Sequence, residues 1–569
     1  MIKTPQASTR APIETPSGTP TPHVSTSAAG SAVLDSAHLG DIKGAFGTIQ
    51  LGENPAATTV RARLKTLLAI IGPGLIVMVG DNDAGAFGTY TQAGQNYGTS
   101  LLWTLLLLVP VIYVNQEMVL RLGAVTGVGH ARLILERFGK FWGAFSVIDL
   151  FILNALTIVT EFIGISIGLS YLGVPQIPGV VIAALVVIGA TSTGSFRRFE
   201  RVCMALVFGS VLLVPIFFMS GPNYGRIARG FIIVGVPAGS NVADVTLLII
   251  AIVGTTIAPW QLFFQQSYVI DKRITPRYIK YEKIDLWLGI VIVVLGAGAI
   301  MAFTAFTFAG TPQFGQFTDA GGVAQGLANH VGRVAGILFA LALIDASIIG
   351  AAAVGLSTSY ALGDVLGLKH SLHRKVSEAK GFYAAFAGLI LLSAVIVVIP
   401  GSPLGLLTVG VQVLAGVLLP SSTLFLLLLC NDKQVMGPWV NGKAMNIFTA
   451  AVIAVLVILS VVLTAAVLFP NISGEAIIGI LVSGMLLCLL VVAGLAALRL
   501  RARVLGKAVR KPAVDRSQRL TWRMPPIALL ERPELSLARR LGLGVLWAYL
   551  VVAMVMVVVR VVQIALGAP

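Results

Sequence analysis

Apolar stretches of membrane length follow one another along most of the chain, separated by short polar connections. Because about 20 apolar residues in a helix cross a bilayer, each stretch is predicted to be one membrane-spanning helix. The predicted spans lie near residues 65–95, 98–122, 141–172, 177–193, 202–219, 243–269, 284–310, 332–364, 381–399, 404–430, 444–469, 475–498 and 541–560. The pattern therefore predicts an all-α polytopic membrane protein with about thirteen spans.

The first span is interrupted at its midpoint by the polar segment GDNDAG, residues 80–85. Each Asp at the centre of a bilayer costs roughly 2.5 to 3.5 kcal/mol on insertion scales, so the pair requires a compensating partner. A divalent cation is the simplest partner. Asp83 would face the freed carbonyls of the break, such as that of Gly80, and the amino end of the next half-helix. The alternative roles are helix capping for Asp83 and turn formation for Asp81 and Asn82.

The sixth span is interrupted as well, by the segment GTTIAPWQ at residues 254–261. Proline lacks a backbone N–H, so it leaves carbonyl groups of the preceding turn free. Two broken helices in corresponding places of two five-span halves indicate an inverted-repeat transporter with its site at the middle of the membrane. We therefore expect the two breaks to face each other.

The composition supports a membrane protein, with 56% hydrophobic residues, 11% charged residues and a mean hydropathy of +0.91. A water-soluble core of this size would not hide so much apolar surface. The net charge of +16 comes from Lys and Arg gathered in alternate connections, with Arg226 and Arg229 as the main exceptions. This pattern predicts a cytoplasmic amino terminus and a lipid bilayer as the partner, and it argues against nucleic-acid binding.

The chain divides by composition into five parts. Residues 1–60 are rich in Ser, Thr, Pro, Ala and Gly and are expected to form a disordered cytoplasmic tail. The rest is expected to comprise a ten-span core at 65–430, two further spans at 431–498, a basic cytoplasmic loop at 499–540 and a last span within 541–569. The pattern predicts no obligatory protein partner.

Cysteine and histidine are placed where neither forms an obvious site. Cys203, Cys430 and Cys488 show no paired spacing, which argues against a disulfide framework or a thiolate metal site. All six histidines fall in the tail or in connections, so no imidazole is expected inside the membrane. No cofactor is predicted. No His-Glu-x-x-His or similar motif is present, so a membrane enzyme is not expected.

Motifs in and around the two breaks resemble the first-helix and sixth-helix regions of Nramp divalent-metal transporters. The matching residues are Gly72-Pro73-Gly74, Asp83 to Ala86, Gln92-Ala93-Gly94, Tyr97 to Trp103, Arg121-Leu122-Gly123 with Thr126-Gly127, Glu161-Phe162 and Gly254 to Pro259. The resemblance covers roughly residues 65–430. It implies a LeuT-like core of two inverted five-helix repeats, in which helices 1 and 6 are unwound, with two or three additional spans after it.

Two departures from the family signatures fall on positions that set ion choice. The family's first-helix Asn is replaced by Ala86, and the sixth-helix Met-Pro-His reads Ala258-Pro259-Trp260. The thioether of Met is a soft ligand, whereas Mg²⁺ takes oxygen ligands and gives up its waters reluctantly. In these departures the chain is similar to the prokaryotic Nramp-related magnesium transporters. The resemblance implies uptake of largely hydrated Mg²⁺, with Mn²⁺ as a second substrate, by alternating access across a prokaryotic cell membrane.

The resemblance also implies a set of site residues centred on Asp83. The other expected contacts with the ion or its waters are Gly80, Asp81, Asn82, Thr255, Thr256, Ala258, Trp260 and Gln261. Residues expected nearby or along the pathway are Ala86, Glu161, Gln265, Asp345 and Gln412, and further polar residues inside spans are Asp149 and Asn154. Packing alone is the alternative role for Trp260 and for Asp345.

Proton coupling is expected to be weak or absent. The places where proton-coupled relatives carry a span-three Asp and span-six histidines hold Ile158, Trp260 and Gln265 here, and only Glu161 remains of the acidic pair. The alternatives are a proton-coupled Mn²⁺/Fe²⁺ symporter, an amino-acid transporter of the same architecture and a non-transporting sensor built on the same fold. The clustered Asp81 and Asp83 would repel an amino-acid carboxylate.

Overall fold

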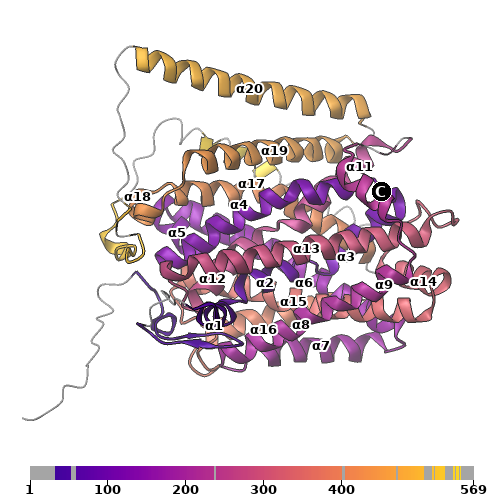
Figure 1. Cartoon of the computed structure of the whole chain (residues 1–569), viewed down its shortest axis with the longest axis horizontal. Helices are drawn as coiled ribbons and strands as arrows, with labels where there is room; N and C mark the ends of the chain where they lie inside the picture. The colour runs from indigo at the N-terminus through magenta and orange to yellow at the C-terminus, as the bar shows by residue number, and fades with distance from the viewer. Residues whose placement is uncertain are drawn as a thin grey trace, which may run out of the picture.

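The computed structural model describes residues 32–52, 59–399 except 236 and 238, 404–469, 472–504, 516–531 except 518, and 542–552 except 545 and 550. Within these residues, ten helices are long and apolar enough to cross a membrane. An eleventh span results if α1 (Val60–Ile70) and α2 (Pro73–Val79), which are bent by 50° relative to each other, are taken together. The prediction of an all-α polytopic membrane protein is confirmed (Figure 1).

Predicted spans 65–95 and 243–269 are each divided into shorter helices, and 177–193 corresponds to a helix of only 16 residues. The other long helices each overlap one predicted span. They are α4 (Leu102–Thr126), α6 (Lys140–Tyr171), α8 (Phe196–Gly209) continued by η3 (Ser210–Leu212) and α9 (Leu213–Met219), α13 (Ile279–Phe308), α15 (Arg333–Leu366), α16 (Lys380–Val398), α17 (Leu404–Cys430), α19 (Lys443–Leu468) and α20 (Gly474–Val504). Shorter helices are α5 (His130–Phe138), α7 (Gln176–Thr191), α10 (Tyr224–Ile232), α14 (Ala320–His330) and α18 (Lys433–Met436). Most of the last predicted span, 541–560, lies outside the described residues.

Both predicted breaks are present. In the first, α2 ends at Val79 and α3 (Ala84–Tyr97) begins after four intervening residues. In the second, α11 (Val242–Thr256) and α12 (Pro259–Asp271) are separated by two residues. Asp83 caps α3, because its Oδ1 accepts a hydrogen bond of 2.9 Å from the Ala86 N–H. The polar and proline residues thus interrupt the helices where the sequence predicts.

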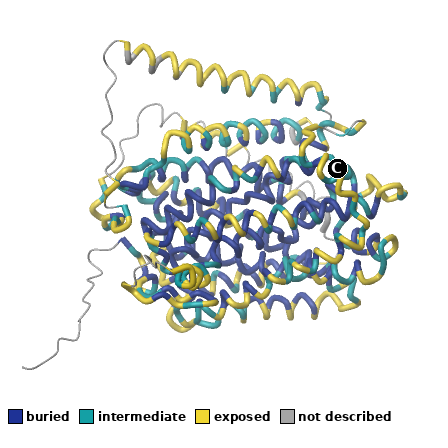
Figure 2. The backbone as a smooth tube through the Cα atoms, viewed as in Figure 1, coloured by how far each residue is buried: buried dark blue, intermediate teal, exposed yellow. Residues whose placement is uncertain are grey.

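Close helix packing surrounds the breaks. The helix α13 lies along α2 and α3, and α15 lies along α6 (Figure 1). Gly74 and Gly289 permit the first of these contacts, since a methyl group on Gly289 would come within 2.8 Å of the Gly74 carbonyl oxygen. Buried residues concentrate in this central bundle, whereas α20 is exposed along its length (Figure 2). The core of the molecule is therefore the set of helices that carries the two breaks.

One expectation about the amino-terminal tail is wrong. Residues 32–52 are ordered: η2 (Ser36–His38) precedes the antiparallel strands β1 (Ile42–Lys43) and β2 (Thr48–Ile49). Ile42 and Ile49 are buried, and His38 Nε2 donates a hydrogen bond of 3.0 Å to the His370 carbonyl. The average composition of the first 60 residues conceals this short apolar pattern. The segment's backbone carbonyls accept hydrogen bonds from Arg197 and Arg201 of α8 and from Arg273 after the end of α12.

A buried ion pair joins three helices near this segment. The Lys272 ammonium lies 2.6 Å from Glu200 Oε1, and both side chains are completely buried. The same ammonium donates to the carbonyl oxygens of Ile70 and Ile71, at 2.6 and 2.9 Å. These contacts connect α1, α8 and the end of α12.

We predict that Lys272→Met lowers the free energy of unfolding by about 3 to 5 kcal/mol, because it leaves the Glu200 carboxylate buried and unpaired. Thermal unfolding of the detergent-solubilised protein would measure the loss. Glu136→Ala is the control, since its pair with Arg132 is partly exposed and worth at most about 1 kcal/mol. Equal melting temperatures for Lys272→Met and the unmodified protein would contradict the prediction.

Candidate functional site

The two breaks face each other in the centre of the bundle, and side chains connect them. Gln261 Nε2, on α12, donates a hydrogen bond to Asp81 Oδ1, on the first break. The hydroxyls of Tyr90, on α3, and Thr256, at the end of α11, lie 2.8 Å apart. All of the expected break residues with side chains, from Asp81 to Asp83 and from Thr255 to Gln261, are buried. The structure therefore brings the two predicted halves of the site together.

Asp83 occupies the position that its two proposed roles require. One carboxylate oxygen caps α3, as described above. The Glu161 carboxyl of α6 lies beside the Asp83 side chain, since a methyl group on Gly350 would contact both side chains. Two carboxyl groups this close repel each other unless a proton or a cation lies between them. Asp83 is thus both a helix cap and a member of an acidic pair at the centre of the bundle.

Glu161 lies closer to the first break than its place in the sequence suggests. Its Oε2 accepts a hydrogen bond of 3.1 Å from the Ala84 N–H, at the start of α3. A methyl group on Gly350 of α15 would come within 2.7 Å of the same oxygen and within 3.1 Å of the Asp83 Cβ. The small residue at this point of α15 lets the acidic pair fit between three helices.

A chain of amide groups ends on Asp81. Gln116 Nε2, on α4, donates to Gln261 Oε1 at 2.9 Å, and Gln261 donates onward to the Asp81 carboxylate. Gln116 is completely buried and was not predicted as a site residue. The signal available in the sequence was its place among polar residues inside the second apolar span. The chain orients two amide dipoles toward the carboxylate, which fixes the position of Asp81.

Several buried oxygen atoms around the breaks have no hydrogen-bond partner among the described residues. They are Asp81 Oδ2, Asn82 Oδ1, Gln116 Oε1, Glu161 Oε1, Thr255 Oγ1 and Gln265 Oε1. Leaving a buried polar group without a partner costs about 1 to 3 kcal/mol, so such groups usually serve a ligand or ordered water. Oxygen donors of this kind suit hard cations. In the described part of the chain, no three His, Cys, Asp or Glu side chains converge as a metal-binding group.

Gln412 and Trp260 border the site in different ways. The Gln412 side chain lies over Gly85, and its backbone carbonyl lies against Gly254, so this residue of α17 contacts both broken segments. The Gln412 Nε2 is buried without a partner in the described structure. Trp260 is buried, its carbonyl accepts from Ser357 Oγ at 2.9 Å, and its ring packs near Phe264. These contacts of Trp260 fit the packing role that was left open.

The remaining expected residues are placed as follows. Gly80 closes α2 through its N–H, which donates to the Ile76 carbonyl at 2.9 Å. Ala86 and Ala258 are buried in the first turn of α3 and just before α12. Asp345 does not join the site, because its half-buried carboxylate lies against Gly209 of α8. Gly350 follows Asp345 by five positions, so Asp345 projects from another face of α15.

A narrow cavity reaches the start of α3 from the connection between α13 and α14. Its lining includes Ala84 and Gly88 of α3, Gly164 of α6, and Phe317 and Asp319 of the connection. The cavity therefore lies beside the first break, between α3 and α6. The site is otherwise closed, as the burial of both carboxylates of the first break shows.

Comparisons with known proteins agree with this architecture. The family model described as natural resistance-associated macrophage protein-like (Nramp) matches residues 74–466. The divalent metal cation transporter MntH of Staphylococcus saprophyticus is 28% identical over 424 residues, which cover 70% of this chain and 92% of that protein. MntH of Latilactobacillus sakei is 28% identical over 426 residues, 70% of this chain and 89% of that protein.

The fold has counterparts among solved structures. The crystal structure of the Eremococcus coleocola manganese transporter, in complex with an aromatic bis-isothiourea substituted compound, superimposes with a TM-score of 0.60 and 21% identity. The similarity covers 77% of this chain and 96% of that chain. A family model that matches more than half of the chain establishes its membership: the chain belongs to the Nramp family of multi-pass membrane transporters.

Proposed function

We propose that this protein, a divalent metal cation transporter, takes up Mg²⁺ as a largely hydrated ion, with Mn²⁺ as a second substrate. The observation that carries the proposal is the chemistry of the side chains around the two breaks, which offer carboxylate, amide and hydroxyl groups. Ala258 stands where the family signature has methionine, and it is buried directly before α12. A cradle of oxygen donors without sulfur suits hard cations.

The arrangement of the donors supports an ion that keeps its waters. Mg²⁺ demands near-octahedral geometry at 2.0–2.1 Å and usually retains several waters, so one or two carboxylates suffice in the protein. Asp83 and Asp81 provide these charges, while Gln116, Gln261 and Gln412 present amide groups at the same breaks. Amide and hydroxyl groups can hydrogen-bond to the waters of the ion instead of to the ion itself.

Mn²⁺ remains a second substrate because it also accepts oxygen ligands. The relatives named above are described as manganese or divalent metal cation transporters. With no thioether at residue 258, this chain lacks the soft ligand that would favour a transition metal over Mg²⁺. We therefore expect weaker discrimination against Mg²⁺ here than in a site that contains methionine.

Transport is proposed to proceed with weak or no proton coupling. The imidazole of His130, in α5, packs against Phe263 of α12 and lies 3.1 Å from Gln266 Oε1. Burial lowers the pKa of His130 to about 4, although the hydrogen bond to Gln266 opposes this shift. The imidazole is therefore neutral at pH 7. The membrane potential alone contributes about 4.6 kcal/mol per 100 mV to the inward movement of two charges.

We predict that Asp83→Asn reduces Mg²⁺ uptake by proteoliposomes at least about tenfold, the loss expected even for an outer metal ligand. Asn caps helices as well as Asp does, so the melting temperature should change little. This substitution separates the ligand role from the capping role. Asp244→Asn, at an exposed position of α11, is the control and should transport normally. Normal uptake by Asp83→Asn would overturn the assignment.

We predict that Ala258→Met shifts the ratio of Mg²⁺ to Mn²⁺ uptake about tenfold toward Mn²⁺, because it adds a soft thioether at the break. Competition of each ion for uptake of the other in proteoliposomes would measure the ratio. Ala258→Leu adds similar bulk without sulfur, so it separates ligation from steric blockage. Identical ratios for the Met and Leu variants would contradict the role of the missing thioether.

We predict that Mg²⁺ uptake at a fixed membrane potential changes less than about twofold when an imposed proton gradient is dissipated, since no imidazole near the site titrates at neutral pH. Clamping the voltage with a potassium ionophore separates the two driving forces. A pH-sensitive dye inside the liposomes should report no proton entry with Mg²⁺. Uptake that collapses together with the proton gradient would instead favour the proton-coupled symporter.

A further inference from the structure

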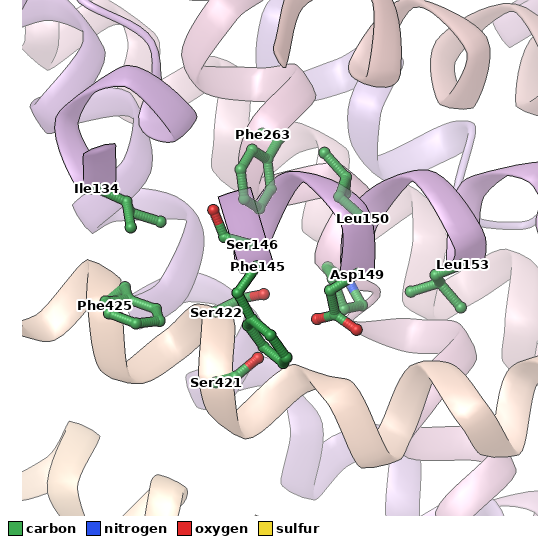
Figure 3. Close-up of a pocket in the computed structure, with 11 residues that line it drawn as sticks. Ile134, Phe145, Ser146, Asp149, Leu150, Leu153, Phe263, Ser421, Ser422 and Phe425 are labelled. Atoms are coloured by element: carbon green, nitrogen blue, oxygen red, sulfur yellow. The ribbon is translucent and has the colours of Figure 1, made fainter. Parts of the chain in front are cut away.

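A second cavity, with one carboxylate in its lining, lies outside the site described above, between α5, α6, α12 and α17 (Figure 3). Pro259, the first residue of α12, lines it, so the cavity begins next to the second break. The cavity volume is about 10 Å³, which is room for a single small occupant. Most of its lining is apolar, including Ile134, Phe263 and Phe425.

The polar groups of this cavity centre on Asp149. Its carboxylate projects from α6 toward α17, where Ser421 and Ser422 lie (Figure 3). The Asp149 side chain is 5% exposed, and its Oδ1 has no hydrogen-bond partner among the described residues. A buried charge among aromatic and aliphatic side chains is costly unless it is paired. In the described structure, no side chain supplies a partner for this Asp149 oxygen.

Two of the hydroxyl groups beside Asp149 already donate their protons to backbone carbonyls. Ser146 Oγ donates its proton to the Gly143 carbonyl at 3.1 Å, and Ser421 Oγ donates to the Leu418 carbonyl at 2.8 Å. Their oxygens are then acceptors, as is the carboxylate. A cavity lined by one anion and hydroxyl acceptors favours a cation over a neutral molecule.

We propose that this cavity binds a monovalent cation of the Na⁺ type, held by the Asp149 carboxylate and the Ser421 and Ser422 hydroxyls. Its single carboxylate balances one positive charge, and its volume admits one ion without a shell of waters. A hydrated divalent ion fits neither the charge nor the space. Hard oxygen donors suit an alkali cation. The cavity is thus distinct from the route of the transported metal.

Occupancy would connect α6, α12 and α17, of which α12 begins at the second break. Asp149 belongs to α6 and Ser421 to α17, while Pro259 and Phe263 of α12 cover the cavity between them. A bound ion therefore stabilises the arrangement in which α12 packs against α6 and α17. Since it binds the folded protein, it raises the melting temperature in proportion to the logarithm of its concentration above its dissociation constant.

The test is thermal unfolding of the detergent-solubilised full chain in NaCl, KCl or choline chloride at equal ionic strength, at a pH held constant. We expect the melting temperature to rise with the logarithm of the Na⁺ concentration, an effect that choline does not produce. Asp149→Asn should abolish the rise, and Ser421→Ala should shift its onset to higher Na⁺ concentration. Ser393→Ala is the matched control, because this buried serine of α16 also donates to a backbone carbonyl but lies outside the cavity.

Three results would overturn the proposal. The first is an unmodified protein that melts at the same temperature in all three salts. The second is a Na⁺ effect that persists unchanged in Asp149→Asn and in Ser421→Ala. The third is a melting temperature that depends on pH but not on Na⁺, which would mean that Asp149 holds only a proton. Equilibrium binding of radioactive Na⁺ to the unmodified protein and to Ser421→Ala decides the question if Asp149→Asn does not fold.

Discussion

Unwound backbone and ionisable side chains at the centre of a membrane must find every partner inside the protein, and this requirement governs the rest of the structure. Asp83 satisfies part of it by capping α3, and Glu161 binds the Ala84 N–H of the same turn. Across the site, Gln116 donates a hydrogen bond to Gln261, and Gln261 donates one to Asp81. Oxygens left without partners after this arrangement are the groups available to a cation. Capping and ion binding therefore use the same residues.

The breaks, the helical spans and the central position of Asp83 could be predicted because local chemistry determines them. A long apolar run predicts a membrane helix, and Gly, Asp, Asn or Pro in its middle disrupts the hydrogen bonding of that helix. These signals need no knowledge of neighbouring helices. The inverted-repeat arrangement followed from the equivalent positions of the two breaks, 80–85 and 254–261, in two halves.

Residues whose role depends on packing between distant helices could not be predicted. Gln116 lies beside other polar residues within an apolar span, and only the packing of α4 brings it to the breaks. Gln412 is expected near the site from the family resemblance alone, and the packing of α17 places it against both broken segments. Asp345 shares a helix with Gly350, yet helical rotation directs it to α8 and away from the site. The order of residues 32–52 depends likewise on donors from other elements, which no local pattern reveals.

Those donors give the positive charge of the chain a structural use. Arg197, Arg201 and Arg273, which belong to the connections that indicate orientation, donate hydrogen bonds to backbone carbonyls within residues 37–47. Lys272, next to Arg273, binds the last carbonyl of α1. Charge-assisted hydrogen bonds of this kind are about twice as strong as neutral ones. Any movement that separates α1 from α8 and α12 to open a path from the central site must therefore break these contacts or carry the amino-terminal segment along.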